Sequence, residues 1–294
     1  MIQIKGNTYV IEGYSKIGAY VLSDEVYLID TGFGESDGKR AYTELKNCNL
    51  RLKAIINTHS HPDHIGGNAY FKKMTACRIF APKIETVFME NTLMTSAYSN
   101  GGDSPSVLIQ KDYCAEKCFS YTLNHEDFPK ELTPVRLPGH SFNMYGYVTR
   151  DDVMFLGDAV TDEKALDKLP FSYMQDIEAE LDTLKKLSET HHEYYVPSHS
   201  AIRCDIKATA LYNIKKIHEG MDLLLEICKT PKSFEEIIRI IFHMFPLKKV
   251  EYGRFTYTGS TVRSYLSYLE KQGKLKIIMR DFVPYWVNVN ITNT

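Results

Sequence analysis

The segment His59-Ser60-His61-Pro62-Asp63-His64 places three imidazoles and one carboxylate within six residues, and it decides how the chain is interpreted. An apolar run at 54–56 precedes it and two glycines at 66–67 follow it. This pattern predicts a short buried strand, a tight loop and a helix that begins near Asp63. Imidazole is the commonest metal ligand among side chains, and grouping these ionisable side chains without a cation would cost desolvation and repulsion. A surface cluster of histidines without a function is the competing interpretation. The internal position, at a strand-to-helix switch where α/β proteins carry their sites, favours a metal site.

Length and composition set the class of protein. With 294 residues, the chain can form one large domain and a small one, or two moderate ones. The hydrophobic fraction of 44% and the charged fraction of 24% are typical of a soluble globular protein. A net charge of −2 excludes a strong overall field that would attract nucleic acid or a membrane surface.

The cysteines and the start of the chain indicate a reducing, cytoplasmic location. The six cysteines are scattered, and the closest pair, Cys114 and Cys118, does not match the usual spacing of a zinc knuckle or a redox motif. We therefore expect free thiols. The chain opens directly into a strand-like pattern, without a basic-then-apolar leader and without an apolar run of membrane-spanning length. The sequence thus predicts a cytoplasmic protein with no membrane partner.

Polar, ligand-type residues follow several predicted strands in the first two thirds of the chain. Short strands alternate with helices there, which predicts a layered α/β body. Asp30, His140, Asp158 and His199 each come just after an apolar strand-like run. Residues 89–112 interrupt this alternation with turn-forming residues, which predicts either an insert beside the site or ordinary packing against the body.

The character of the sequence changes after residue 204. Helical periodicity covers 208–228, 234–244 and 259–272, and two strand-like runs follow at 274–279 and 285–289. Three helices followed by a hairpin are the pattern of a winged helix-turn-helix. Residues 205–294 carry more Lys and Arg than Asp and Glu, whereas residues 1–204 are acidic overall. The sequence therefore predicts a catalytic domain at 1–204 and a smaller, mainly helical, winged-helix-like domain at 205–294.

The candidate ligands can be divided between two metal ions. One ion would take three nitrogens, from His59, His61 and His140. The second would take an oxygen and two nitrogens, from Asp63, His64 and His199. Asp158 can bridge both ions with its two carboxylate oxygens. About three protein ligands per ion leave coordination positions open, as a catalytic ion requires. The absence of a cysteine thiolate from this set favours hydrolytic chemistry on zinc, manganese or iron.

These motifs together resemble the metallo-β-lactamase superfamily over residues 1–204. The resemblance is carried by the His59–His64 segment, by Asp30 within Leu28-Ile29-Asp30-Thr31-Gly32, and by His140, Asp158 and His199 in the usual order. It implies an αββα sandwich with a two-metal site at one edge of the two sheets. It also implies that Asp30 supports the metal loop by hydrogen bonding and is not a ligand. The implied reaction is attack by a bridging hydroxide on a carbonyl carbon or phosphorus, with Asp63 orienting the nucleophile or accepting its proton.

The branch of the superfamily determines the substrate. The commonest true β-lactamases carry Cys where Asp158 stands, which disfavours that activity. The pattern leaves thioester hydrolases similar to glyoxalase II, lactonases, and phosphodiesterases or nucleases. Many members read Gly-His-Thr-Pro-Gly where this chain reads Gly139-His140-Ser141-Phe142-Asn143, so this loop departs from the common pattern. We expect Asn143 and Tyr173 to line the substrate pocket.

Three functions remain open at this level. The first is hydrolysis of an ester, thioester or lactone of a small molecule, with residues 205–294 shaping the pocket or a homodimer. The second is a phosphodiesterase or endoribonuclease that holds nucleic acid by basic and aromatic side chains of the C-terminal domain; a plain amphipathic helix explains the same residues. The third is a DNA-binding regulator with a metal-sensing sandwich, which the intact ligand set disfavours. The side chains that would hold nucleic acid are Arg254, Arg263, Lys271, Lys274 and Lys276, with Tyr257, Tyr265 and Tyr268 stacking on bases.

Overall fold

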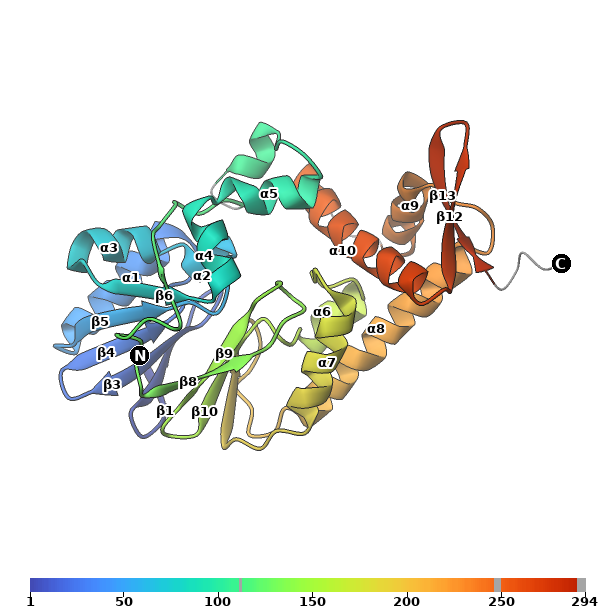
Figure 1. Ribbon diagram of the computed structural model, residues 1–294. Coiled ribbons are helices and arrows are strands. Elements are labelled where there is room, and N and C mark those ends of the chain that lie inside the picture. The colour runs from blue at the N-terminus through green and yellow to red at the C-terminus, as the bar shows by residue number, and fades with distance from the viewer. Residues whose placement is uncertain (111–112, 246–249, 290–294) are drawn as a thin grey trace.

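Two β-sheets form the body of the protein in the computed structural model, which describes residues 1–110, 113–245 and 250–289 (Figure 1). The first sheet has seven strands in the order β1 (Ile2–Lys5), β2 (Thr8–Ile11), β3 (Ile17–Leu22), β4 (Glu25–Ile29), β5 (Arg51–Ile56), β6 (Arg78–Ala81) and β7 (Tyr121–Thr122). The second has four strands in the order β11 (Tyr194–Pro197), β10 (Val153–Gly157), β9 (Tyr145–Thr149) and β8 (Leu132–Arg136). The sheets pack face to face around buried side chains that include Val10, Ile56, Tyr147 and Phe155.

The strand directions bring the carboxyl ends of several strands together. Strands β4 to β7 pair in parallel, and so do β10 and β11, whereas the other strand pairs are antiparallel. Loops that leave the carboxyl ends of parallel strands meet at one edge of a sheet, where α/β proteins place their sites. The segments that follow β4, β5, β10 and β11 carry the predicted site residues.

Helices cover the outer faces of both sheets, so the predicted layered α/β body is confirmed (Figure 1). The first sheet is covered by α1 (Gly34–Asn47) and α3 (Asn68–Thr75), and the one-turn helix α2 (Pro62–Ile65) begins within the predicted metal loop. In α1, Gly38, Ala41 and Leu45 recur at helical spacing and are buried toward the sheet. The remaining helices of the body are α4 (Lys83–Glu90), α5 (Leu93–Asn100), the 3₁₀ turn η1 (Ser106–Ile109), α6 (Glu163–Lys168) and α7 (Ile177–Ser188).

The C-terminal part follows the predicted order of three helices and a hairpin. Its elements are α8 (Lys207–Ile227), α9 (Phe234–Met244), α10 (Tyr252–Lys271), β12 (Leu275–Arg280) and β13 (Val283–Asn288). Ser233 and Glu236 form a capping box that starts α9. Helix α10 begins at Tyr252, before the predicted start at Gly259. The sequence reading missed its first turns because glycine, threonine and aromatic residues fill them, and these have low helix propensity.

One hydrophobic core joins the four-stranded sheet to the C-terminal helices. Met154 of β10, Leu184 of α7, Leu224 of α8 and Leu266 of α10 belong to the same cluster of buried side chains. Helix α8 also packs along α7. The division at residues 204 and 205 and the winged-helix assignment stay predictions. In space, α8 lies along α7, whereas α9 and the β12–β13 hairpin lie farther from the two sheets (Figure 1).

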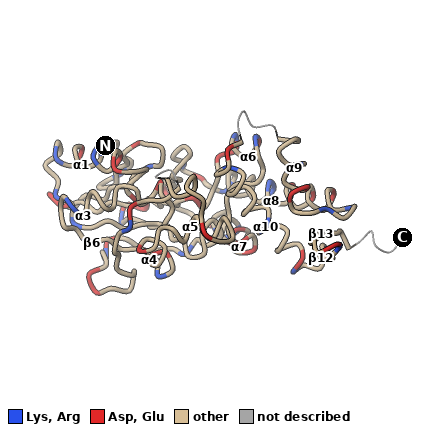
Figure 2. The backbone as a smooth tube through the Cα atoms, turned by 90° about the horizontal axis from the view of Figure 1, so that it is seen from above, with Lys and Arg blue, Asp and Glu red and all other residues tan. Residues whose placement is uncertain are grey.

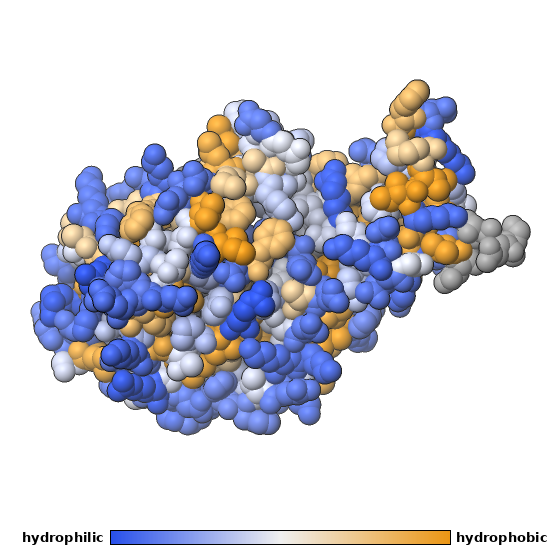
Figure 3. Space-filling view, in the orientation of Figure 1, coloured by the Kyte–Doolittle hydropathy of each residue, from blue (hydrophilic) through white to orange (hydrophobic). Residues whose placement is uncertain are grey.

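Basic and acidic residues are mixed along the described part of the chain (Figure 2). Lys and Arg are interspersed with Asp and Glu along both the sandwich and the C-terminal elements (Figure 2). Exposed apolar side chains occur on α4 and α5 and on the β12–β13 hairpin, where Phe282 is fully exposed (Figure 3). Within residues 1–110, 113–245 and 250–289, no helix is both long and apolar enough to cross a membrane.

Candidate metal centre

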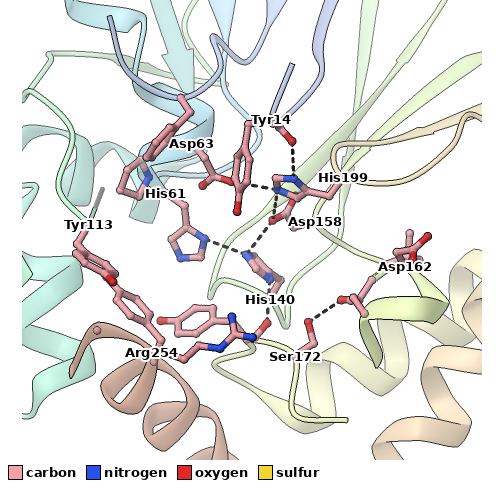
Figure 4. A pocket seen from close by; sticks show the side chains of 18 of the residues that line it. Tyr14, His61, Asp63, Tyr113, His140, Asp158, Asp162, Ser172, His199 and Arg254 are labelled. Carbon is pink, nitrogen blue, oxygen red and sulfur yellow. Dashed lines mark hydrogen bonds and ion pairs between the residues drawn. The ribbon is translucent and has the colours of Figure 1, made fainter. Parts of the chain in front are cut away.

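Seven side chains from four separate segments converge at one edge of the sandwich, and Figure 4 shows the five of them that line a cavity. We call them the metal centre: His59, His61, Asp63, His64, His140, Asp158 and His199. The first four lie on the loop after β5 and on α2, whereas His140 lies between β8 and β9. Asp158 directly follows β10, and His199 follows β11. The structure thus brings together every residue that the sequence assigned to metal binding.

Three histidines form the first group. The Nδ1 atom of His61 lies 2.9 Å from the Nε2 atom of His59 and 2.9 Å from the Nε2 atom of His140. Nitrogen lone pairs that face one another this closely repel, and a cation between them removes the repulsion. The donor set therefore fits one divalent ion held by three nitrogens.

Asp63, His64, Asp158 and His199 form the second group. The Nε2 atom of His199 lies 3.0 Å from Asp63 Oδ2, and the Nε2 atom of His64 lies 3.2 Å from Asp158 Oδ1. These two atoms, His64 Nε2 and Asp158 Oδ1, are buried, and apart from this ion-pair contact neither has a hydrogen-bond partner among the described residues. Buried polar atoms without partners are costly, so their presence here fits a bound cation. Asp158 Oδ2 also lies 3.5 Å from His140 Nε2, which puts Asp158 between the two groups.

The outward-facing ring nitrogens fix the orientation of the histidines. The Nδ1–H groups of His140 and His199 donate to the backbone carbonyls of Tyr173 and Tyr14, at 2.9 and 3.0 Å. Because these carbonyls can only accept, the Nδ1 atoms of both rings carry the donated hydrogen, and the Nε2 atoms face the metal centre. Gly139 has a φ of +135°, and a side chain there would collide with Glu180 of α7. Glycine therefore lets the loop that carries His140 pack closely against α7.

Asp30, which we predicted to support the metal loop, forms hydrogen bonds with residues of that loop. Its Oδ2 accepts from His64 Nδ1 at 2.8 Å and from the Thr58 hydroxyl at 2.7 Å, and its Oδ1 accepts from the Thr58 backbone N–H at 2.8 Å. The Thr58 hydroxyl oxygen lies 3.0 Å from His59 Nδ1. Asp30 is only 2% exposed and has a left-handed φ of 62°. It thereby orients a histidine in each group without facing the metal positions itself.

Glu85 of α4 is a supporting residue that the sequence analysis missed. Its Oε2 accepts from the Ser60 backbone N–H at 3.0 Å and from the Ser60 hydroxyl at 2.6 Å. Its Oε1 accepts from the Ser141 hydroxyl at 2.8 Å and from the Asn143 backbone N–H at 3.3 Å. One buried carboxylate thus ties the loop of His59 and His61 to the loop of His140. The unusual residues Ser141 and Asn143 are therefore part of this tie.

The two groups differ in charge. Burial lowers the pKa of His61 and of His140 to about 4, and lowers the pKa of His59 well below its ordinary value. Burial alone would also lower the pKa of His199, but the carboxylate of Asp158, together with that of Asp63, raises it to about 10. The first group is thus a set of neutral imidazoles, whereas the second holds carboxylates paired with histidines.

A cavity of about 1020 Å³ opens over the metal centre (Figure 4). Tyr14, Phe33 and Tyr173 line it beside His61, Asp63, His140, Asp158 and His199. The predicted pocket residue Tyr173 therefore lies at the site, with its ring 5.2 Å from that of His61. Asn143 does not line the cavity in the described structure. Its side chain instead accepts from the Ile84 backbone N–H at 3.4 Å, at the start of α4.

The start of α10 forms the opposite side of this cavity. We call Glu251, Gly253, Arg254 and Tyr257 the α10 wall. Arg254 and Tyr257, which the sequence linked to nucleic acid, thus line the cavity. Two other residues of that set have different surroundings: the Arg263 guanidinium lies 3.7 Å from the centre of the Phe234 ring, and Tyr265 is fully buried in the core. The suggested stacking of Tyr265 on a base is therefore wrong.

The described part of the 89–112 segment does not line this cavity. Helix α5 packs against α10, and its residues Tyr98 and Asn100 line a separate cavity of about 630 Å³. Tyr113, just after this segment, does line the main cavity. Asp112, at the end of the predicted insert, lies outside the described residues.

The family follows from a comparison of the whole chain with protein-family models. Residues 5–199 match the model of the metallo-beta-lactamase superfamily. The chain belongs to this superfamily. The match covers the segment that the sequence had assigned to a catalytic domain, and it contains all seven side chains of the metal centre.

Curated relatives match over shorter segments. A hydroxyacylglutathione hydrolase of Pseudomonas syringae pv. syringae (strain B728a) is 34% identical over 88 residues, which are 30% of this chain and 32% of that protein. A probable metallo-hydrolase of Bacillus subtilis (strain 168) is 29% identical over 117 residues, which are 40% of this chain and 50% of that protein. The matched segments thus span half of these relatives' length or less. Both relatives are named as hydrolases.

Solved structures show that the fold is shared along nearly the whole chain. A metallo-beta-lactamase family protein of Thermus thermophilus superposes with a TM-score of 0.68 at 19% identity, covering 96% of this chain and 98% of that one. A beta-lactamase domain protein of Burkholderia ambifaria has a TM-score of 0.73 at 16% identity, covering 98% and 93%. The α/β metallo-beta-lactamase fold is therefore confirmed.

Proposed function

We propose that this protein hydrolyses an ester, thioester or lactone bond of a small molecule, and that it does so with two divalent metal ions, zinc in preference to manganese or iron. The observation that carries the proposal is the metal centre itself, with ring nitrogens and carboxylates converging below a cavity of about 1020 Å³. A cavity of this size suits a small organic substrate. The weak similarity to hydroxyacylglutathione hydrolases supports the thioester as one candidate bond.

Each residue of the metal centre has a distinct task in this proposal. The three-histidine group would hold one ion and the Asp63 group the other, with Asp158 contacting both. Divalent ions bound there would make hydroxide available near neutral pH and stabilise the oxyanion that forms. Neighbouring histidines hold the pKa of the Asp63 carboxyl below its ordinary value although burial alone would raise it, so Asp63 is ionised. Asp63 also lines the cavity and can accept a proton from the nucleophile or orient it.

Metal analysis and a panel of substrates test this function. Purified protein should bind two equivalents of zinc, measured by elemental analysis, and should hydrolyse a thioester or a lactone. The same preparation should leave bis-p-nitrophenyl phosphate and single-stranded RNA intact. Cleavage of either phosphodiester, with none of the thioester or lactone, would instead establish the phosphodiesterase or endoribonuclease alternative and contradict the proposal.

Other expectations from the sequence stay predictions. These are the winged-helix assignment of residues 205–294, the cytoplasmic location and the homodimer. Light scattering of the purified protein tests the homodimer. Binding of nucleic acid would require a continuous row of basic residues from the C-terminal elements to the metal centre. In the described residues, basic and acidic residues are mixed along the C-terminal elements (Figure 2).

A further inference from the structure

We infer that the substrate carries a carboxylate remote from the bond that is cleaved, and that Arg254 binds this carboxylate. The inference rests on the proposed function and specifies its substrate class. It comes from the charge and the shape of the α10 wall, which faces the metal centre across the cavity.

Arg254 supplies the positively charged side chain of the α10 wall. Among the described residues that line the cavity, it is the only Lys or Arg. Its side chain extends from the first turn of α10 into the cavity, on the side of His140 and Ser172 (Figure 4). It forms no ion pair with any residue of the described ranges. A guanidinium presents a planar fork of donors that matches a carboxylate in bidentate geometry, so an anionic group of the substrate is the natural partner.

The other charges of the wall favour an anion of low charge. Asp63 and Asp158 belong to the metal centre, where cations would neutralise them. Asp162 also lines the cavity and adds negative charge to its lining. A polyanion such as a nucleotide or an oligonucleotide would meet this carboxylate, and one guanidinium would have to balance several negative charges of the ligand. A monoanionic carboxylate needs only the one cation.

Aromatic rings connect the metal centre to the α10 wall. The Tyr173 ring lies 5.2 Å from the His61 ring and 5.4 Å from the Tyr257 ring, centre to centre. Tyr257 in turn stacks on Tyr113 at 5.5 Å and 15°. Tyr257 follows Arg254 by three positions on α10, so both project from one side of the helix. The part of the substrate between the cleaved bond and the carboxylate should therefore be apolar or flat.

A second, smaller cavity extends the space at the same place. It measures about 200 Å³ and shares Tyr173, Arg254 and Tyr257 with the main cavity. Leu169 and Phe171 add apolar side chains to its lining. The main cavity alone is at the upper end of the range for drug-sized ligands, roughly 300 to 1,000 Å³. The combined space suits an elongated substrate better than a simple lactone.

Matched thioesters test this inference on the metal-loaded protein. Each pair consists of a free acid and its methyl ester; one pair has the carboxylate in the acyl part and the other in the thiol part. Hydrolysis is followed by the loss of thioester absorbance. In at least one pair, the wild-type protein should have the higher kcat/KM for the acid, and this preference should shrink as salt is added. Arg254→Gln should lower kcat/KM for that acid by about 10- to 100-fold, the range for a hydrogen bond to a charged group, and should change kcat/KM for the methyl ester less than about 2-fold.

Two further variants separate charge from folding. Arg254→Lys keeps the charge and should restore part of the preference for the acid. Arg239→Gln, an exposed arginine of α9 away from the cavity, should behave like the wild type. Two results would overturn this inference and leave the proposed function standing. One is an equal loss of kcat/KM for the acid and the methyl ester in Arg254→Gln, and the other is a wild-type protein that prefers neither acid over its methyl ester. A wild-type protein that hydrolyses none of the thioesters, yet cleaves a phosphodiester, would overturn the proposed function and this inference with it.

Discussion

The metal centre and the α10 wall face the same cavity but are built in opposite ways. In the metal centre, His59 and His64 are fully buried, and Asp30 and Glu85 hold the loops beside them. In the α10 wall, Arg254 is exposed and has no ion-pair partner in the described structure. A region whose side chains are held by many hydrogen bonds can keep reacting groups at fixed positions. In a region with few internal contacts, side chains can be substituted at little cost in stability. We therefore expect the chemistry to reside in the first region and substrate selection in the second.

The largest effect should come from removing Asp158, which lies between the two groups of the metal centre. Asp158→Ala should lower kcat by about 1000-fold or more, because in the proposed function this carboxylate would contact both ions; such a loss corresponds to roughly 4 kcal/mol of transition-state stabilisation. Elemental analysis should also show less bound metal. The exposed Asp182 of α7 gives a matched control, since Asp182→Ala should retain both properties. Full metal content and turnover in Asp158→Ala would remove the basis for assigning the chemistry to this region.

A smaller loss is expected when only the support of the histidines is changed. The Asp30 carboxylate accepts hydrogen bonds from the Thr58 hydroxyl and from His64 Nδ1. In Asp30→Asn, the amide NH₂ group would replace one of the accepting oxygens and would face these donors. Metal affinity, measured by competition with a chromophoric chelator, should fall about 10- to 100-fold. Asp24→Asn, in the exposed turn before β4, should leave it unchanged. An unchanged affinity in Asp30→Asn would show that the rings are held by their loops alone.

Glu85 sharpens the comparison because it contacts no candidate ligand side chain and acts through the loops. Glu85→Gln replaces one accepting oxygen by a donor and so breaks the tie between Ser60 and Ser141. We expect a loss of about 1 to 3 kcal/mol in the free energy of unfolding, measured by urea titration, and a fall in kcat of about 10-fold. Glu90→Gln, on the exposed face of the same helix, should change neither. A stable variant with normal kcat would mean that the two loops hold their positions independently.

The smallest effect should come from the α10 wall. Tyr257→Leu removes a ring that packs on Tyr113 and Tyr173, and should raise KM about 2- to 12-fold while kcat is preserved, because ring contacts contribute about 0.5 to 1.5 kcal/mol to binding alone. Tyr257→Phe keeps the ring and should stay close to the wild type. Steady-state kinetics on the preferred substrate distinguishes the two constants. A fall in kcat with an unchanged KM would place Tyr257 in the chemistry and erase the contrast between the two regions.

The sequence predicted the metal centre because each part of it has a local signal. His59 to His64 form a dense motif, and Asp30, Asp158 and His199 each follow an apolar strand. Parallel strands bring such positions to one edge, so their convergence in the structure is a direct result of strand order. The layered α/β fold could be predicted on the same basis, since strand and helix periodicities alternate along residues 1–204.

Glu85, which supports the metal loops, and the residues that line the opposite side of the cavity have no such local signal in the sequence. Glu85 looks like any acidic residue of a short amphipathic helix, and the groups that donate to it come from Ser60, Ser141 and Asn143, which are distant in the sequence. Arg254 and Tyr257 lie on turns of α10 that propensity alone does not mark as helical. Their place in the cavity depends on how α10 packs against the sandwich, and this is a tertiary property that periodicity does not encode.

The core that runs from β10 to α10 means that the two regions should melt as one. Leu266 and Leu269 of α10 are buried in the same cluster as Met154 and Leu156 of β10. Heating that separates α10 from the sandwich would therefore also expose the helix-covered face of the sheet whose strand β10 leads into Asp158. Calorimetry should then record a single cooperative transition. A ligand that contacts only the α10 wall would raise the melting temperature of the entire protein. Thermal stability thus becomes a means of finding substrates before any reaction has been observed.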